Sequence, residues 1–430
     1  MKPLNSLSRL QCLLIALLFV LQLLIGLSYV QLLSDQAISS VGILTIGAIE
    51  LLLCLVLIAI LRNKYSTVAT TVFLLLLVNV LITPINLKKA SETFITLPPN
   101  QDYKVKIVGD VTPGFSGISR ITTDDHGFRV THPVDYKNKG DVYRIFAIGA
   151  STTAQMLLSN EKTWTALLEK DLEKAWGRKV EIINAGVNGL RAEQHFITFE
   201  NILQYSPDAV IFLMGINDWT KHIRDHFVAQ GASSAHSVEA PGASDKSQGT
   251  SVRFMNLVNA FDIRKSLIWL GLTGLRNRLF DVVHIDDGSY YSNQNNSLAR
   301  KDTREFSTTT VSDNYKTWVE RILSKCAATE TRCVFVNQPN AYSPEISDEL
   351  KRRLWMTPVE ESYTLRLPDL ERIAKVYNTW LITAAARQGM EVCDIAPAIP
   401  PTTDYLYDDC HFNEGGARLV ASLIARCMLQ

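Results

Sequence analysis

A serine, an aspartate and a histidine in this chain have the types and the order needed for nucleophilic catalysis. Ser151 follows the apolar run 143–148, where a strand is expected to turn into a helix. Asp408 lies three residues before His411, just ahead of an amphipathic segment at the end of the chain. A serine hydroxyl needs a base to take its proton, and that base needs a carboxylate to orient it. The pattern therefore predicts that Ser151 attacks a carbonyl carbon, with His411 as base and Asp408 as its partner.

Attack on an ester also requires fixed hydrogen-bond donors for the oxyanion that forms. Three donors follow predicted strands: the Ser151 N–H, the Gly189 N–H and the side-chain amide of Asn217. One such donor is typically worth about 3–4 kcal/mol. Gly186 competes with Gly189 as the glycine that supplies the second donor, and the choice between them is left open.

The elements that position these residues alternate between strands and helices from residue 143 onward. Continuous apolar runs indicate strands that are covered on both faces. Their alternation with helices indicates a parallel, doubly wound sheet, in which ligands bind beyond the carboxyl ends of the strands. The predicted strands are 143–148, 180–184, 209–214, 333–337 and 390–395, and the predicted helices are 164–176, 192–204, 314–326, 370–387 and 415–427.

Most of the apolar excess of the chain lies before residue 90, in three separate runs. Each run has about 20 residues, which is enough to cross about 30 Å of hydrocarbon. Residues 1–89 are therefore predicted to form a three-span transmembrane anchor. The predicted spans are 10–32, 41–61 and 67–87.

Positive charge predicts how this anchor is oriented. Loops that stay in the cytoplasm are enriched in lysine and arginine. Lys2 and Arg9 precede the first run, and Arg62 and Lys64 lie between the second and the third. The chain is thus expected to be a multi-pass cell-membrane protein with its N-terminus in the cytoplasm. Its catalytic domain is expected on the outer, periplasmic or extracellular side. Glu50 lies within the second run, and its role is left open.

The remainder of the chain divides into two parts. Residues 90–142 hold proline and glycine turn signals and are predicted to be a connector. Residues 143–430 are predicted to form the α/β domain, with an insertion at 219–311 where the strand–helix rhythm breaks. The expected fold class is α/β: three N-terminal transmembrane helices followed by a flavodoxin-like, doubly wound domain with a five-stranded parallel sheet.

The cysteines outside the predicted spans are odd in number, so one or two disulfides and a leftover thiol are possible. Five buried free thiols are the alternative, and the pairing is left open. These residues are Cys326, Cys333, Cys393, Cys410 and Cys427.

Four short blocks of the chain resemble those of the SGNH hydrolase superfamily, also called GDSL-like. The blocks are Gly149-Ala150-Ser151-Thr152-Thr153, Gly189, Gly215-Ile216-Asn217-Asp218 and Asp408-Asp409-Cys410-His411. Ala150 stands where the family usually has Asp, and Phe412 stands where Pro is common. The resemblance covers roughly residues 143–427 and implies ester substrates, often acetyl groups on carbohydrate.

Several other classes lack support in the sequence. The net charge is zero, without a long basic run, which argues against nucleic-acid binding. The chain has no Gly-rich phosphate loop, and Thr153 replaces the second glycine of an α/β-hydrolase elbow. The acid–histidine block at 408–411 has no second ligand pair at metal-site spacing. Neither a cofactor nor a metal is expected.

Three functions fit these observations. The first is a membrane-anchored serine esterase that acts outside the cytoplasm and removes acetyl or other acyl groups from cell-envelope carbohydrate through an acyl-enzyme. The second is an O-acyltransferase that passes the acyl group to a surface glycan instead of water. The third is a non-catalytic glycan-binding or assembly protein. The expected partners are an ester substrate such as an acylated carbohydrate and, as an integral protein, the membrane.

Overall fold

The structure, a computed structural model, describes residues 94–107, 112–229, 283–286, 302–358 and 361–430. All of these residues belong to one compact unit, made of Glu92–Ala240 together with Phe280–Gln430. The predicted spans, Glu50 and most of the predicted insertion at 219–311 lie outside the described residues.

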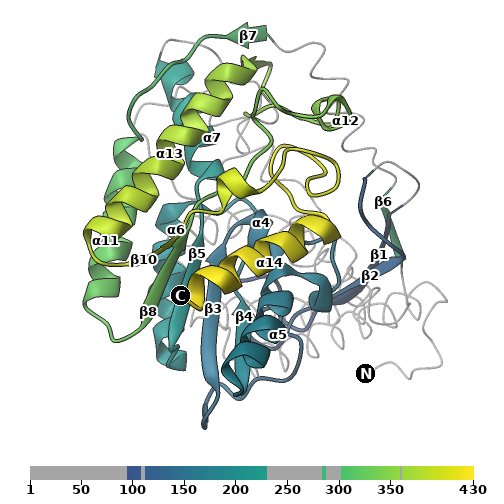
Figure 1. Cartoon of the computed structure of the whole chain (residues 1–430), viewed down its shortest axis with the longest axis vertical. Helices are drawn as coiled ribbons and strands as arrows, with labels where there is room; N and C mark the ends of the chain where they lie inside the picture. Colours follow the sequence, from purple (N-terminus) through teal and green to yellow (C-terminus); the bar gives the residue numbers. More distant parts are fainter. Residues whose placement is uncertain (1–93, 108–111, 230–282, 287–301, 359–360) are drawn as a thin grey trace, which may run out of the picture. The chain divides into compact units, whose positions relative to one another are not determined.

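A five-stranded parallel sheet forms the centre of this unit, as the apolar runs predicted (Figure 1). Its strand order is β10-β8-β5-β3-β4, so the first strand lies inside the sheet and the chain adds strands on both sides of it. This is the order of flavodoxin-like folds. The strands are β3 (Tyr143–Gly149), β4 (Val180–Asn184), β5 (Ala209–Leu213), β8 (Arg332–Val336) and β10 (Glu391–Cys393).

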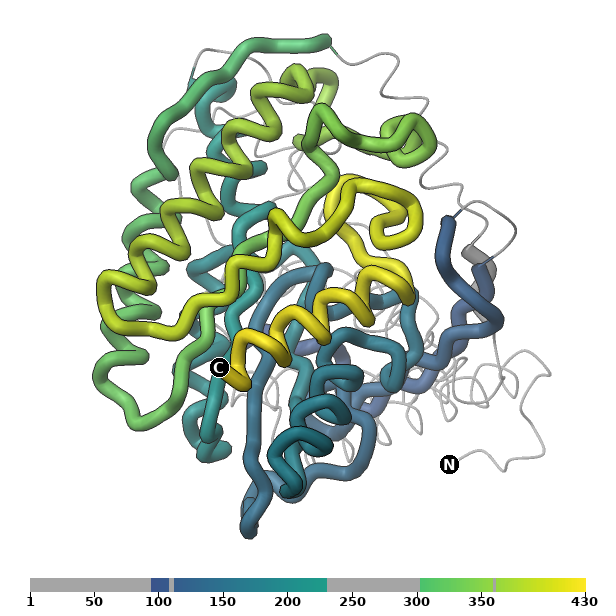
Figure 2. The backbone as a smooth tube through the Cα atoms, viewed as in Figure 1, coloured from purple at the N-terminus to yellow at the C-terminus, as the bar shows by residue number. Residues whose placement is uncertain are grey.

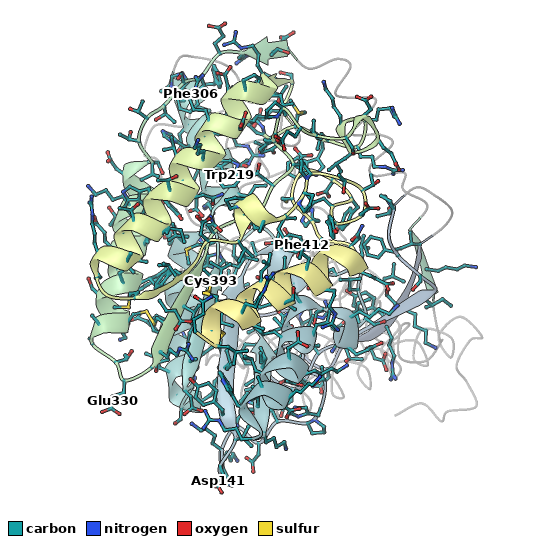
Figure 3. All side chains as sticks on the ribbon, viewed as in Figure 1. Asp141, Trp219, Phe306, Glu330, Cys393 and Phe412 are labelled. Atoms are coloured by element: carbon teal, nitrogen blue, oxygen red, sulfur yellow. A yellow bond between two sulfur atoms is a disulfide. The ribbon has the colours of Figure 1, made fainter. Side chains whose placement is uncertain are left out.

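Both faces of the sheet are apolar because successive side chains of a strand point to opposite sides. Phe146 and Ile148 of β3 belong to one buried cluster, whereas Ile145 and Ala147 belong to another. The first cluster also contains Trp219, labelled in Figure 3. Helices α6 (Ala192–Ile202), α7 (Ile216–Ala229), α11 (Asp313–Ala327) and α13 (Leu367–Arg387) cover the first face, and α5 (Trp164–Trp176) and α14 (Glu414–Met428) cover the second (Figure 1).

Polar side chains cap the starts of α5 and α14. The Thr163 hydroxyl accepts a hydrogen bond from the Ala166 N–H at the start of α5, and Gly177 ends that helix in the left-handed conformation. The Asn413 side chain caps α14 in the same way by accepting from the Gly416 N–H. Such caps satisfy amides that have no partner inside the helix.

Shorter elements lie around the central sheet. β1 runs antiparallel to β2 and parallel to β6, and β7 pairs with β9. The short strands are β1 (Asp102–Ile107), β2 (Ile118–Thr122), β6 (Val283–Asp286), β7 (Asp302–Arg304) and β9 (Tyr363–Leu365). The short helices are α4 (Ser151–Ala154), α12 (Asp348–Lys351), η4 (Asn160–Lys162), η5 (Leu203–Tyr205) and η7 (Ala396–Ala398).

The region expected to be a connector packs against the α/β core. It supplies β1 and β2, and its Phe128 is buried in the first core cluster. The backbone of Arg129 exchanges two hydrogen bonds with that of Asn184, at the end of β4. Phe128 and Arg129 therefore support the central sheet directly.

The expectation of a multi-pass membrane protein is corrected by the structure. Among the residues that the structure describes, no helix combines the length and the apolar composition that crossing a bilayer requires. The fold class that the structure supports is an α/β protein with a five-stranded parallel sheet. The predicted multi-pass membrane localisation is therefore not supported by the part of the chain that the structure describes.

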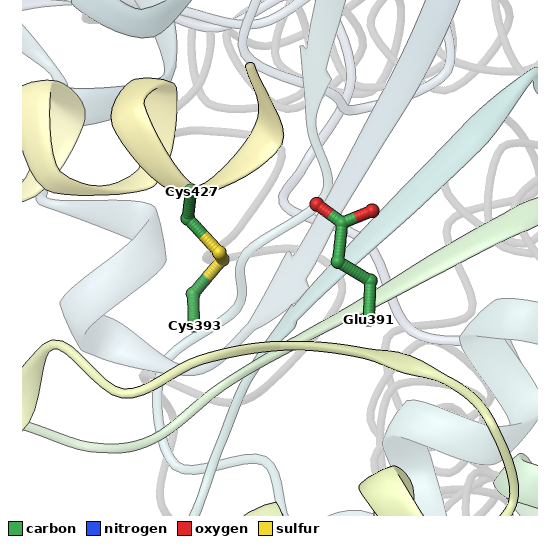
Figure 4. Close-up of side chains that lie close together, drawn as sticks. All are labelled: Glu391, Cys393 and Cys427. Carbon is green, nitrogen blue, oxygen red and sulfur yellow. A yellow bond between two sulfur atoms is a disulfide. The ribbon is translucent and has the colours of Figure 1, made fainter. Parts of the chain in front are cut away.

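Two disulfides pair four of the five cysteines named above, and Cys410 is a buried free thiol. Cys326 of α11 is bonded to Cys333 of β8, closing a short loop. Cys393 of β10 is bonded to Cys427 of α14 (Figure 4). The second bridge closes a much longer loop, which contains Asp408 and His411.

Candidate active site

Ser151 lies where the sequence predicted it, at the turn from a buried strand into a helix. It is the first residue of α4, two residues after the end of β3. Its Oγ lies 2.7 Å from Nε2 of His411, although 260 residues separate the two in sequence. The carboxyl edge of the parallel sheet therefore brings the predicted nucleophile and base within hydrogen-bond distance.

His411 contacts Asp408 through its other ring nitrogen. Nδ1 lies 2.7 Å from Oδ2 and 2.9 Å from Oδ1 of the carboxylate. Oδ1 also accepts the backbone N–H groups of Cys410 and His411. Because Nδ1 donates its proton to the carboxylate, Nε2 is left to accept the hydroxyl hydrogen of Ser151.

The charges of this pair stabilise each other. Burial opposes ionisation of Asp408, but the facing imidazole and the hydrogen bonds it receives lower its pKa below the usual value. Burial also disfavours the imidazolium of His411, yet the Asp408 charge raises the pKa of His411 well above its ordinary value. The side chain of Asp408 is 1% exposed and that of His411 is 21% exposed, so only the histidine can reach solvent.

The long segment between β10 and α14, which includes η7, carries the acid and the base (Figure 2). Leu406 and Phe412 form an isolated antiparallel bridge across it, and the Tyr407 N–H donates to the His411 carbonyl. Phe412 lies beside the start of α14 (Figure 3). The ring of Tyr407 stacks on the imidazole of His411, with centroids 5.5 Å apart.

The three expected oxyanion donors come from three separate segments: Ser151 begins α4, Asn217 lies in the first turn of α7, and Gly189 lies in the loop between β4 and α6. Ser151 opens α4, whose first turn has no side-chain cap, so its N–H is not used by a capping residue. Gly189 is exposed, with a φ of +78°. Asn217 donates one amide hydrogen to the carbonyl of Leu190, which anchors it to the residue after Gly189. No hydrogen bond among the described residues joins Gly189 or Asn217 to Ser151.

Gly186 and Gly189 have different surroundings. A Cβ at Gly186 would lie 2.4 Å from the Ala154 backbone nitrogen, whereas a Cβ at Gly189 would meet nothing within 4 Å. Gly186 therefore allows close packing against α4. Gly189 has the exposed position that a donor to a substrate needs, which favours it over Gly186.

Comparison with protein families decides what kind of chain carries this site. A sequence model of the GDSL-like Lipase/Acylhydrolase family matches residues 147–419, well over half of the chain. The chain belongs to the GDSL-like lipase/acylhydrolase family. The match covers the segments that contain Ser151, Asn217 and His411. No curated protein matches the chain.

Solved structures of GDSL-like and esterase proteins are similar to the chain at low identity. One is a lipase/acylhydrolase from Enterococcus faecalis, at 17% identity and a TM-score of 0.32, covering 66% of this chain and 95% of that one. Another is a catalytic mutant of Axe2, an acetylxylan esterase from Geobacillus stearothermophilus, at 11% identity and a TM-score of 0.35, covering 66% and 93%. At these scores, membership of the GDSL-like family rests on the sequence match.

Several residues around the GDSL-like site gave no signal in the sequence. The carbonyls of the short helix α4 are bound from outside: Trp164 Nε1 donates to the Thr152 carbonyl, and Asn184 Nδ2 donates to the Thr153 carbonyl. The guanidinium of Arg129 donates to the next two carbonyls, those of Ala154 and Gln155. Each of these is a single residue on a separate element, so no spacing rule could have identified it.

Asp409 supports the other side of the site. Its carboxylate accepts the Tyr342 hydroxyl at 2.8 Å and the Trp355 N–H at 2.6 Å, and its carbonyl accepts the Ala341 N–H. These contacts bind the segment after β8 to the loop that carries His411. In the sequence this residue was visible only as a neighbour of Asp408.

Three groups of side chains place possible metal-ligand atoms close together, and in the first two groups these atoms already contact other protein groups. Asp408, Cys410 and His411 place ligand atoms close together, but the imidazole binds Asp408 and Ser151, and burial raises the pKa of the Cys410 thiol to about 11. Near Glu391, both cysteine sulfurs belong to a disulfide (Figure 4). The Glu391 carboxylate is paired with Arg332. Asp124, Asp125 and His126 form a third, partly exposed group.

Proposed function

We propose that this chain is a serine ester hydrolase in which Ser151 is the nucleophile, His411 the general base and Asp408 the orienting carboxylate. The observation that supports this most strongly is the continuous hydrogen-bonded chain from Ser151 Oγ through His411 to Asp408. Groups of this kind act as a constellation, and membership of the acylhydrolase family agrees with the chemistry.

In the acylation step, Ser151 Oγ attacks the ester carbonyl carbon and its proton passes to Nε2 of His411. The imidazolium that forms is stabilised by Asp408, which stays ionised. The tetrahedral intermediate then collapses, and Nε2 returns the proton to the leaving alcohol. An acyl group is left on Ser151.

In the deacylation step, water takes the place of the alcohol. His411 removes a proton from the water as it attacks the acyl carbon, and the same proton returns to Ser151 Oγ as the acid leaves. In both steps the negative oxygen would accept hydrogen bonds from the Ser151 N–H, the Gly189 N–H and the Asn217 amide. Such donors act mainly on the transition state, so they raise kcat more than they change KM.

The substrate we propose is an ester of acetic or another acyl acid with a carbohydrate hydroxyl. This substrate class follows from the resemblance of the four sequence blocks to the SGNH hydrolases. Release of acetate from acetylated oligosaccharides, compared with hydrolysis of long-chain nitrophenyl esters, tests it. A strong preference for the long-chain esters would contradict the carbohydrate assignment and leave the serine chemistry intact.

The test of the function is a comparison of Ser151→Ala with wild type. We expect Ser151→Ala to lose about 10⁴-fold or more in kcat on a short acyl ester. A fluorophosphonate probe should modify wild type at Ser151, with loss of fluoride, and should leave the variant unmodified. Ser324→Ala is the matched control, because the Ser324 hydroxyl only donates to a carbonyl within α11. Wild-type activity in Ser151→Ala would refute the proposal.

A further inference from the structure

Arg129 is a buried cation at the carboxyl end of the short helix that begins with Ser151. Its side chain is among the largest that are fully buried, and the residue is 2% exposed. One terminal nitrogen donates to the carbonyls of Ala154 and Gln155, and the other donates to the carbonyl of Leu158. These carbonyls belong to the end of α4 and to the turn that follows it.

The remaining donors of this guanidinium go to one side chain. Nε and a terminal nitrogen lie 3.1 Å and 2.8 Å from Oδ1 of Asn160. Asn160 is itself fixed, because its amide nitrogen donates to the carbonyls of Thr122 and Val130. Arg129 therefore joins α4 to a rigid support built from β2 and η4.

Arg129 has no ion pair among the described residues, which is unusual for a buried charge. Burial lowers the pKa of Arg129 to about 10, so the group still carries its charge at neutral pH. Its charge is balanced by the negative ends of several carbonyl dipoles at a helix carboxyl terminus, where a cation is favoured. The guanidinium is thus adapted to bind backbone carbonyls rather than an acidic side chain.

The helix that carries Ser151 depends on such support. It spans only four residues, and the N–H groups of Thr153, Ala154 and Gln155 donate to the carbonyls of Ala150 and Ser151. Isolated helices of this length do not form in water, because too few bonds offset the cost of ordering the chain. The orientation of Ser151 must therefore be imposed by groups outside the helix.

We propose that Arg129 is a positioning residue for the nucleophile. Its planar guanidinium holds the last carbonyls of α4 so that Ser151 Oγ stays within hydrogen-bond distance of His411 Nε2. The inference rests on the proposed role of Ser151 and adds a residue that does not touch the reacting atoms.

A lysine cannot replace this arrangement. The guanidinium directs five donors in one plane, whereas the ammonium group of lysine is a point charge with three donors at the end of a flexible chain. Arg129→Lys keeps the charge but cannot reach all four acceptors together. A displacement of about 1 Å at a reacting group can cost about a hundredfold in rate.

Arg144 provides a matched control. It is also buried, at 1% exposed, and its donors reach the Glu181 carboxylate and the carbonyls of Tyr205 and Asp135. It is the second residue of β3, at the end of that strand away from Ser151. Arg144→Lys therefore removes a comparable buried network without touching α4.

The experiment measures the two lysine variants side by side in the full chain. For each variant, the folded fraction is measured by circular dichroism and the thermal midpoint is recorded. The kinetic readouts are kcat and KM on a short acyl ester and the rate of fluorophosphonate labelling of Ser151. We expect Arg129→Lys to lower kcat and the labelling rate about a hundredfold per folded molecule, with KM changed less than about threefold. Arg144→Lys should change these rates less than about threefold, whatever its thermal midpoint.

Two results would be negative, and they differ. If Arg129→Lys and Arg144→Lys label Ser151 equally fast per folded molecule, the positioning role is wrong and the proposed function stands. If wild type itself neither hydrolyses esters nor reacts at Ser151, the proposed function has failed.

If Arg129→Lys does not fold, Asn160→Ala replaces it. This variant keeps Arg129 but removes the one side-chain acceptor that its guanidinium has among the described residues. We expect about a tenfold loss in kcat per folded molecule, with little change in KM. A value equal to that of Arg144→Lys would overturn the inference.

Discussion

The two halves of the candidate site are held in different ways. The half that carries Asp408 and His411 is organised mainly by its own residues, since one carboxylate binds the imidazole and two backbone amides within a four-residue stretch. The half that carries Ser151 is held by side chains from elsewhere, including those of Trp164 and Asn184. On the acid–base side the contacts to the reacting side chain are local, although Asp409 also joins the loop to Tyr342 and Trp355; on the nucleophile side the supporting contacts are long-range.

This difference determines what substitutions should do. On the acid–base side, a single side chain has both a structural and a chemical role, so changes there should affect pH behaviour as well as rate. On the nucleophile side, supporting residues lie away from the reacting atoms, so changes there should reduce kcat without moving a pKa. The predictions below test this contrast, from the largest expected effect to the smallest.

Asp408→Asn should have the largest effect, about 10⁴-fold in kcat, because the amide favours the wrong imidazole tautomer. It should also change the pH profile. In wild type the base must be neutral, so kcat/KM is lost as pH falls through the pKa of His411, which Asp408 raises. Removing the charge lowers that pKa, so the rising limb of the profile should move to lower pH.

The exposed residue Asp404, in the same loop, offers a control. Asp404→Asn should keep both the rate and the profile of wild type. A rising limb that stays in place in Asp408→Asn would mean that Asp408 does not set the charge state of His411.

The same pair also affects stability: the contribution of His411, whose folded pKa is raised, is present at low pH and is lost as pH rises through that pKa.

Asn217→Ala should lower kcat by about 10²–10³-fold with a small change in KM, because an oxyanion donor acts mainly on the transition state. The loss should be the same at every pH above the rising limb. A variant that changed KM alone would show that Asn217 binds the substrate and does not stabilise its transition state. Asn201→Ala is a control, since the Asn201 amide only donates to a carbonyl within α6.

The two disulfides should contribute unequally to stability. The bridge between Cys393 and Cys427 spans 34 residues, whereas that between Cys326 and Cys333 spans 7. Loop-closure entropy then gives about 4 kcal/mol for the first and about 2 kcal/mol for the second. Double-serine variants of each pair, unfolded in urea, measure the difference. Equal losses, or a larger loss at the shorter loop, would contradict this order.

Glu414→Gln should have the smallest effect. Its carboxylate accepts hydrogen bonds from Ser116 and Lys162 at the start of α14, on the partly exposed surface. Partly exposed pairs of this kind contribute about 1 kcal/mol or less. We expect a slightly lower free energy of unfolding and unchanged kcat. A marked loss of activity would show that this contact, and not the loop itself, keeps His411 in place.

The sequence predicted the central sheet and its helices because their signals are local and repeated. The predicted helix 164–176 agrees with α5, where Thr163 supplies the cap and Gly177 the termination signal. The closeness of Asp408 to His411 followed from their spacing. Arg129 could not be predicted, because a lone arginine after Phe128 has no pattern that indicates which carbonyls it will bind.

The membrane prediction shows a different limit. A long apolar run indicates that its side chains avoid water, but it does not by itself establish whether lipid or protein surrounds them. In the part of the chain that the structure describes, no helix meets the requirements of a span. The strands β1 and β2 were missed for a different reason: the proline and glycine signals around them indicated only turns.

The most direct test of the central claim is a search for the acyl-enzyme. Wild-type protein is mixed with a short acyl ester, quenched in acid during turnover and digested, and its peptides are measured by mass spectrometry. The account predicts an acyl group on Ser151, absent in Ser151→Ala and formed more slowly in His411→Ala. Ester turnover with no acyl group on Ser151, or with the acyl group on another residue, would contradict it.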